Sequence, residues 1–293
     1  MSNKGKSIEV IIAPPPPHMV GDGFRVHSFF PGGRLIDKKR MSPFFLMDYG
    51  AKVDFSPSEH PRGVGVHPHR GFETVTIAYH GRIAHHDSAG NSGIIGEGDV
   101  QWMTAASGLL HKEYHEETFS KTGGLFQMVQ LWVNLPAKYK MTPPKYQEIT
   151  HGMMGTYQLP DDKGVIEVIA GEYKSVKGPA SIFTPMHVYN AKLKKGGKAE
   201  LNFPSEYNTG LLVIEGSAVI NRETAATDHF VLFKNDGELI NIEASEDAIL
   251  LVLSGEPIDE PIAQYGPFLM NTWNEVEQAI QDVNEGKFGV LED

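Results

Sequence analysis

The sequence predicts an all-β protein made of two similar domains in tandem and closed by a short C-terminal helix. The 31 glycines and 19 prolines suit a fold that is rich in turns. Between these turns lie short runs of β-branched and aromatic residues, such as 74–79, which indicate strands. The second half also repeats the first, because residues 208–216 resemble residues 73–81. We therefore expect one domain at 1–140 and another at 141–293, with the chain crossing between them at 136–144.

Local patterns place the individual elements. Apolar and aromatic runs predict strands that include residues 24–30, 44–50 and 128–135. Residues 274–284 instead repeat apolar side chains at helical spacing, which predicts an amphipathic helix. Asn271 or Thr272 can cap the start of this helix, and Gly286 can end it.

Composition and charge narrow the class of protein. The chain has 293 residues and a formal net charge of −11, so we do not expect it to bind nucleic acid directly. It has no cysteine, which excludes disulfides, thiolate catalysis and zinc–cysteine sites. We find neither the pattern of a signal peptide nor an apolar run of membrane-spanning length. We expect a monomeric cytoplasmic protein, or a nuclear one in a eukaryote, that does not contact a membrane.

Two histidine-containing motifs give the main functional signal. His67 and His69 are two residues apart beside a predicted strand, and alternate residues of a strand share a face. His111 and Glu113 repeat this spacing. An isolated pair of this kind is more often two hydrogen-bonded surface histidines. Two such pairs, in a region that holds eight of the 13 histidines, favour a metal site. Its donors suit a divalent ion such as iron, manganese, copper, nickel, cobalt or zinc.

Two more polar residues are candidates for the surroundings of this site. Asp48 lies among apolar residues, and a buried carboxylate needs partners. It could orient a histidine or accept hydrogen bonds from backbone amides. Gln130 lies on the face of the strand at 128–135 that could line a pocket, and it could contact a bound ligand there. A packed strand in which the Gln130 amide is hydrogen-bonded would explain this residue equally well.

The motifs around these residues resemble those of the pirin family in the cupin superfamily. The resemblance rests on residues 67–75, 98–105, 108–113, 130–135 and 266–272. It implies two tandem cupin domains, each a jelly-roll-like β-sandwich or barrel, with the metal in the first. It also implies a ligand set of His67, His69, His111 and Glu113. Glu73, at a position that binds metal in many other cupins, would then be a hydrogen-bonding residue that supports a ligand or lines the pocket.

The resemblance further implies an enzyme of the quercetin 2,3-dioxygenase type, which acts on O2 and a flavonol. Fe(II) is the expected cofactor, with Mn, Cu, Ni, Co and Zn as alternatives. Glu113 could also act as the catalytic base for the flavonol 3-hydroxyl if it loosens from the metal. The alternative function is an iron-dependent, redox-sensing regulator that binds a transcription factor or a metabolic enzyme without turnover. The same four ligands would serve either function.

The second domain is expected to lack the metal. Aligning Gly216 with Gly81 puts Asn202 at the position of His67 and Pro204 at that of His69. Neither residue supplies an imidazole, so we expect a structural domain there.

Overall fold

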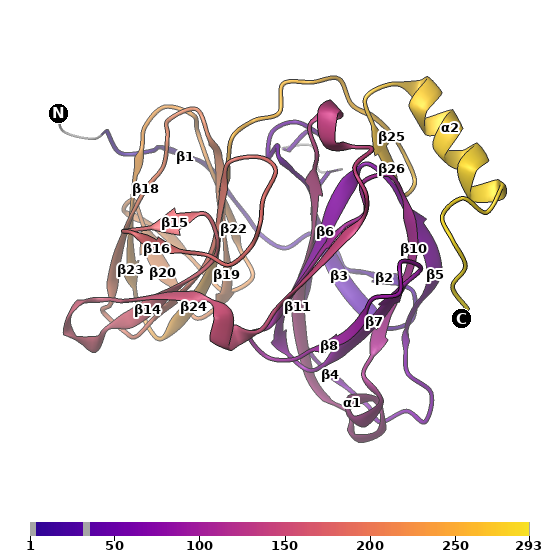
Figure 1. Ribbon diagram of the computed structural model, residues 1–293. Helices are drawn as coiled ribbons and strands as arrows, with labels where there is room; N and C mark the ends of the chain where they lie inside the picture. The colour runs from indigo at the N-terminus through magenta and orange to yellow at the C-terminus, as the bar shows by residue number, and fades with distance from the viewer. Residues whose placement is uncertain (1–3, 32–35, 293) are drawn as a thin grey trace. The chain divides into compact units, whose positions relative to one another are not determined.

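A computed structural model describes residues 4–31 and 36–292. The chain is mostly β, with 52% of its residues in strands and 9% in helices. It forms two compact units (Figure 1). We call residues 16–31, 44–151 and 258–292 the histidine unit, and residues 4–15, 36–43 and 152–257 the apolar unit. No helix within the described ranges is long and apolar enough to cross a membrane.

The histidine unit contains a seven-stranded and a four-stranded antiparallel sheet. The larger sheet has the order β12–β9–β6–β11–β4–β3–β2, and the smaller one β5–β10–β7–β8. The strands of the larger sheet are β2 (His18–Val20), β3 (Phe24–Phe30), β4 (Phe44–Phe55), β6 (Phe72–His80), β9 (Val100–Thr104), β11 (Gly124–Asn134) and β12 (Lys145–Ile149). Those of the smaller sheet are β5 (Gly63–His69), β7 (Ile83–Asp87), β8 (Ser92–Ile95) and β10 (Leu109–His115).

The apolar unit repeats this architecture. Its sheets have the orders β1–β22–β19–β24–β17–β14–β13 and β18–β23–β20–β21. The strands of the larger sheet are β1 (Ile8–Ile12), β13 (Gly155–Gln158), β14 (Gly164–Ala170), β17 (Met186–Leu193), β19 (Asn208–Glu215), β22 (Phe230–Phe233) and β24 (Ala248–Gly255). Those of the smaller sheet are β18 (Lys198–Asn202), β20 (Ala218–Ile220), β21 (Glu223–Ala225) and β23 (Leu239–Ala244). The internal repeat indicated by the sequence is therefore a repeat of strand order.

Short elements complete both units. Two-stranded ribbons are formed by β15 (Glu172–Tyr173) with β16 (Val176–Lys177), and by β25 (Ala263–Tyr265) with β26 (Phe268–Met270). The 3-10 turns are η1 (Ala137–Tyr139), η2 (His151–Met153) and η3 (Pro160–Asp162). The predicted C-terminal helix is α2 (Trp273–Asn284), and Thr272 caps it in a capping box with Glu275. The short helix α1 (Glu117–Thr122) was not predicted.

The two units are not the two continuous stretches 1–140 and 141–293. Strand β1 pairs with β22 of the apolar unit, at the edge where β12 pairs with β9 in the histidine unit. At the other end of the chain, residues 258–292, which include α2, belong to the histidine unit. The chain also stays in the histidine unit through β12, so it leaves that unit after residue 151 and not at 136–144.

Lys140 anchors the turn that follows η1. Its ammonium group donates to the backbone carbonyl of Gly71 at 2.7 Å, to that of Leu269 at 2.7 Å and to Oδ1 of Asn134 at 2.6 Å. The side chain is only 2% exposed, so all three of its donors are used inside the protein. Lys140 therefore joins the turn after β5 to residues 258–292, which we call the C-terminal segment.

We expect Lys140→Met to lower the Tm by about 5–10 °C, because three hydrogen bonds are lost and their acceptors stay buried, at a cost of about 2–4 kcal/mol. Thermal unfolding followed by circular dichroism measures this shift. Lys138→Met is the matched control, since Lys138 lies on the same turn and is exposed. Equal Tm values for the two variants would contradict the anchoring role of Lys140.

Candidate metal centre

Three histidines meet where β5 and β10 pair. His67 and His69 are alternate residues of β5, so both side chains lie on one face. In the antiparallel ladder His111 of β10 stands directly opposite His67, which puts its side chain on that same face. The sequence prediction that these three imidazoles come together is confirmed by their ligand atoms, which all lie within 4.8 Å of one another.

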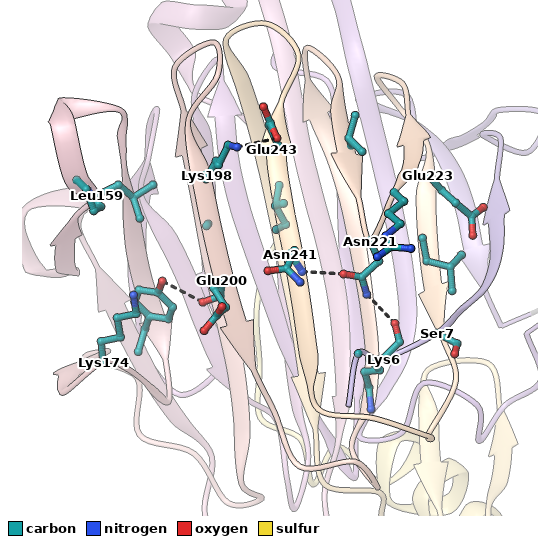
Figure 2. A pocket seen from close by; sticks show the side chains of 18 residues that line it. Lys6, Ser7, Leu159, Lys174, Lys198, Glu200, Asn221, Glu223, Asn241 and Glu243 are labelled. Atoms are coloured by element: carbon teal, nitrogen blue, oxygen red, sulfur yellow. Dashed lines mark hydrogen bonds and ion pairs between the residues drawn. The ribbon is translucent and has the colours of Figure 1, made fainter. Parts of the chain in front are cut away.

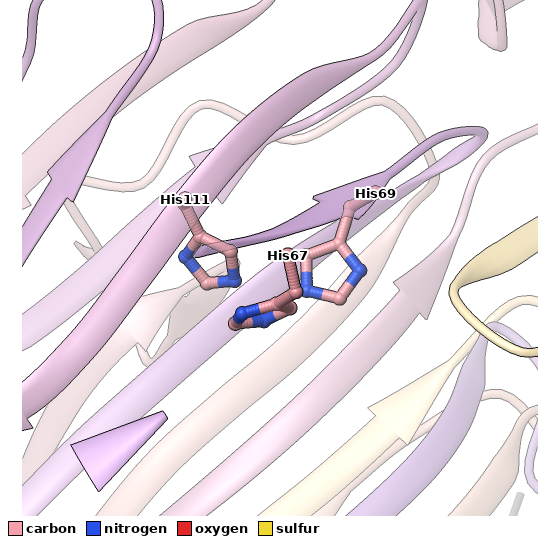
Figure 3. Close-up of side chains that lie close together, drawn as sticks. All are labelled: His67, His69 and His111. Carbon is pink, nitrogen blue, oxygen red and sulfur yellow. The ribbon is translucent and has the colours of Figure 1, made fainter. Parts of the chain in front are cut away.

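The three rings are turned toward one another (Figure 3). Ring centroids are 4.7 Å apart for His67 and His69, 4.2 Å for His67 and His111, and 4.6 Å for His69 and His111. Such a spacing lets one small ion contact a nitrogen of each ring. Within residues 4–31 and 36–292, no second cluster of three such donors is found.

Burial keeps these imidazoles in the neutral form that binds metals. Desolvation lowers the pKa of His67, and it lowers the pKa values of His69 and His111 well below 6.5. The carbonyl of Gly65 lies 2.8 Å from Nδ1 of His67, which leaves Nε2 of that ring as the metal donor. Nδ1 of His69 and both nitrogens of His111 have no hydrogen-bond partner among the described residues. These donors fit a divalent transition metal.

Glu113 lies two residues beyond His111 on β10, and its carboxylate is buried. Oγ1 of Thr76 lies 3.4 Å from Oε1 of Glu113. Desolvation raises the pKa of Glu113 to about 7, against the opposing effect of hydrogen bonds from Thr76 and Gln130. The cluster of ligand atoms within 4.8 Å contains only the three histidines, so Glu113 as a fourth ligand stays a prediction.

The other predicted site residues fall on both faces of the larger sheet. Gln130 stands opposite Thr76 on one side and Asp48 on the other, so all three side chains share the face toward Glu113. Asp48 accepts a hydrogen bond from Ser28, and burial raises the pKa of Asp48. Glu73 is an odd-numbered residue of β6, unlike Thr76, and therefore points to the opposite face.

Glu73 accepts a hydrogen bond of 2.7 Å from Thr104 on that opposite face. Its carboxyl group is fully buried, and desolvation raises its pKa to about 7. The predicted hydrogen-bonding role of Glu73 agrees with this contact, whereas its position on the sheet does not fit a role in lining the pocket.

The face of the larger sheet that points toward Glu113, which we call its inner face, is partly exposed at β4 and β11. Leu46 and Asp48 of β4, and Gln130 and Trp132 of β11, are partly accessible, although their neighbours in sequence are buried. On β6 the residues of the same face are buried from Phe72 to Ala78, and Gln101 and Met103 of β9 are buried as well. His67 is also partly accessible. Partly accessible side chains on this face therefore lie on β4 and β11.

Two further histidines in this region have different roles. His115 packs among Phe24, Phe55 and Phe126, and its Nε2 lies 2.8 Å from the carbonyl of Gly23, so it belongs to the core. Its exclusion from the predicted ligand set agrees with this packing. His85 stands opposite Glu113 on β7 and is buried.

Sequence reasoning did not single out His85 for the interior. Both of its ring nitrogens lack a partner among the described residues, and its ring centroid is 5.0 Å from that of Tyr146. Burial lowers the pKa of His85 to about 4. Strand alternation puts His85 and His86 on opposite faces of β7, but only the pairing of His85 with Glu113 shows which of the two points inward.

The apolar unit has hydrocarbon side chains at the matching positions. Ile242 pairs with Ile220 as Glu113 pairs with His85, and both isoleucines are buried. The hollow of about 950 Å³ in this unit instead crosses the outer face of the β18–β23–β20–β21 sheet (Figure 2). Its lining includes the ion pair between Lys198 and Glu243 but no histidine. We therefore assign no metal chemistry to it.

The fold and the site together define the class: a protein of two cupin domains with a candidate three-histidine metal centre in the first. Comparison with family models also finds two domains, although the second model runs on through residues 258–289, which pack in the histidine unit. The Pirin model matches residues 23–133, and the model of the pirin C-terminal cupin domain matches residues 188–289. The chain belongs to the pirin family.

Similar proteins extend over nearly the whole chain. A Pseudomonas aeruginosa protein named as a candidate quercetin 2,3-dioxygenase is 48% identical over 92% of this chain and 94% of its own length. Pirin-1 of Arabidopsis thaliana is 37% identical over 87% of this chain and 86% of its own. A crystal structure titled quercetin 2,3-dioxygenase from Acinetobacter baumannii has a TM-score of 0.92 and 46% identity, and it covers 99% of this chain and 100% of its own. The fold is also shared with an Escherichia coli pirin solved with nickel(II), at 20% identity and a TM-score of 0.63 over 85% of this chain and 100% of its own.

The lowered pKa values of the three histidines predict how metal binding depends on pH. A proton competes with the metal for each imidazole, and a lower pKa weakens the proton as a competitor. We therefore expect the loaded protein to keep its metal as the pH falls through 6.5 and to release it only at lower pH. Dialysis at stepped pH followed by elemental analysis measures this, with circular dichroism as the control for acid unfolding. Release centred at or above pH 6.5 from folded protein would contradict it.

Proposed function

We propose that this protein is a metal-dependent dioxygenase of the quercetin 2,3-dioxygenase type. The observation that carries the proposal is the set of three neutral, inward-facing imidazoles beside the buried carboxyl of Glu113, next to a half-exposed stretch of the inner face. The names of similar proteins at 46% and 48% identity support the same reaction class. They also favour this function over the regulatory alternative.

The proposed metal ligands are His67, His69, His111 and Glu113, with Fe(II) as the proposed ion and Mn, Cu, Ni, Co or Zn as alternatives. When bound, such an ion would supply a site for the flavonol 3-hydroxyl and the redox chemistry that joins the substrate to O2. A ligand set of this size leaves room for an exogenous donor, which the reaction requires.

Glu113 is the proposed base. It would act in this way when its carboxylate leaves the metal: without the ion its pKa of about 7 lies near neutral pH, where a carboxylate of that basicity can accept the proton of the 3-hydroxyl. Thr76 and Gln130 hold the carboxyl group from the opposite sheet and so fix its orientation. In the overall reaction one flavonol and one O2 give a depside and one carbon monoxide, and both atoms of O2 stay in the depside.

Asp48 and Gln130 are the proposed substrate-facing residues. Both are partly accessible and lie on the inner face. Trp132 shares this face and its ring centroid is 5.4 Å from that of His69. An aromatic side chain beside two polar ones suits a flat polyphenol that needs both stacking and hydrogen bonds.

The first test is metal-dependent turnover. We expect protein reloaded with Fe(II) without oxygen to consume quercetin and release carbon monoxide once air is admitted, and His69→Ala to reduce the rate by about 100-fold or more. Quercetin absorbance and elemental analysis are the measurements. His86→Ala is the matched control, because His86 lies outside the cluster and contacts Tyr114. Stoichiometric metal without flavonol turnover in the unaltered protein would sink the dioxygenase proposal.

A second test concerns Glu113. We expect Glu113→Gln to lower kcat by about 100-fold, because a positioned base contributes roughly 100- to 10,000-fold to such a step. Metal content is measured on the same sample, so that loss of the base and loss of the ion are told apart. Undiminished turnover by Glu113→Gln with its metal retained would remove the base role.

A further inference from the structure

Arg70 follows His69 directly and is buried inside the histidine unit. Its Nε donates to the carbonyl of Ser107 at 2.7 Å, in the turn that leads into β10. Its Nη1 lies 2.8 Å from Oδ2 of Asp282 on α2. Its guanidinium carbon is 4.6 Å from the ring centroid of Phe288. One side chain therefore joins the end of β5, the approach to β10 and the C-terminal segment.

Asp282 supplies the counter-charge for this buried guanidinium. The two side chains are 6% and 11% exposed, so water screens their attraction only weakly. Oδ1 of the same carboxylate accepts hydrogen bonds from Gln278 at 2.8 Å and Lys287 at 2.9 Å. The carboxylate is thus held from the side of α2 as well as from the side of the histidines.

The C-terminal segment also contacts the ligand-bearing strands directly. The carbonyl of Pro267 accepts a hydrogen bond from the ring of His69 and, at 3.2 Å, one from the backbone N–H of Arg70. The ring of Phe288 lies so close to Gly108 that a methyl group there would sit 2.5 Å from it. Ser88 donates to the carbonyl of Phe288 and accepts from the backbone N–H of Leu110. These contacts reach β5 on one side and β10 on the other.

We propose that Asp282 is a positioning residue for the metal centre and that it acts through Arg70 on His69. Docking of α2 fixes the orientation of Arg70, and the adjacent Pro267 carbonyl fixes the ring of His69. The C-terminal segment thereby sets the geometry of the ligand cluster from outside the barrel. This inference rests on the proposed metal site and does not depend on which substrate is turned over.

Coupling of this kind works in both directions. If docking of α2 tightens metal binding, then metal binding must tighten the docking of α2 by the same factor. The helix should therefore open less often in the loaded protein than in the metal-free protein. This is a property that a purely structural ion pair, unconnected to the site, would not show.

The test uses Co(II), whose visible spectrum reports coordination geometry. We expect Asp282→Asn to weaken Co(II) binding by about 10-fold, as is typical when a residue that orients a metal ligand is lost, and to change the Co(II) spectrum. Asp282→Glu should restore much of both. Glu285→Gln is the matched control, because it removes an exposed carboxylate near the same helix end that pairs with Lys287 and not with Arg70. Wild-type affinity and spectrum in Asp282→Asn would overturn the proposal.

Hydrogen exchange in the unaltered protein gives an independent answer, even if Asp282→Asn fails to fold. We expect the amides of α2 to exchange several-fold more slowly with Co(II) bound than without it. Equal exchange in the two states would overturn the proposal. Co(II) binding with slowed exchange, together with no flavonol turnover by the Fe(II)-loaded protein, would leave the proposal standing and defeat only the dioxygenase. A protein that binds neither Co(II) nor Fe(II) would defeat both.

Discussion

The burial of polar donors inside a β-barrel is the constraint on which the rest of the structure depends. A buried imidazole or carboxyl group without a partner costs free energy, and nitrogens of His69 and His111 find none among residues 4–31 and 36–292. Their positions must therefore be held by other parts of the fold. Part of the packing in the histidine unit comes from an apolar cluster that contains Phe24, Ile83 and Phe126. A bound metal would replace the missing partners and turn the cost into binding energy.

The apolar unit shows the same architecture without this constraint. Val252 pairs with Leu211 as Gln130 pairs with Thr76, and the two aliphatic side chains belong to one continuous buried cluster. Strand order and register are kept, so they do not require the polar residues. The difference between the units lies in the side chains that point inward. The candidate metal site therefore depends on the inward-pointing side chains of the histidine unit and not on the fold, which both units share.

The sequence predicted what depends on local spacing and left out what depends on distant contacts. Alternate positions on a strand put His67 and His69 on one face, the second motif and the family resemblance added His111, and helical spacing was enough for α2. Local spacing could not predict that β1 belongs to the apolar unit and residues 258–292 to the histidine unit. The first of these assignments depends on the pairing of β1 with β22, which are far apart in sequence. The same holds for the pairing of Arg70 with Asp282, which no local pattern indicates.

Two residues of the pirin motif that begins at His67 take part in long-range contacts of this kind. Arg70 and Gly71 come directly after His69, and each is tied to the C-terminal segment: Arg70 pairs with Asp282, and Lys140 bridges the carbonyls of Gly71 and Leu269. A side chain on Gly71 would meet the carbonyl of Leu269 at 2.1 Å, and its φ of +92° favours glycine. The residues after His69 thus serve the docking of the C-terminal segment. Placement of the histidines and docking of the C-terminal segment are parts of one packing problem, so we expect a change in one to alter the other.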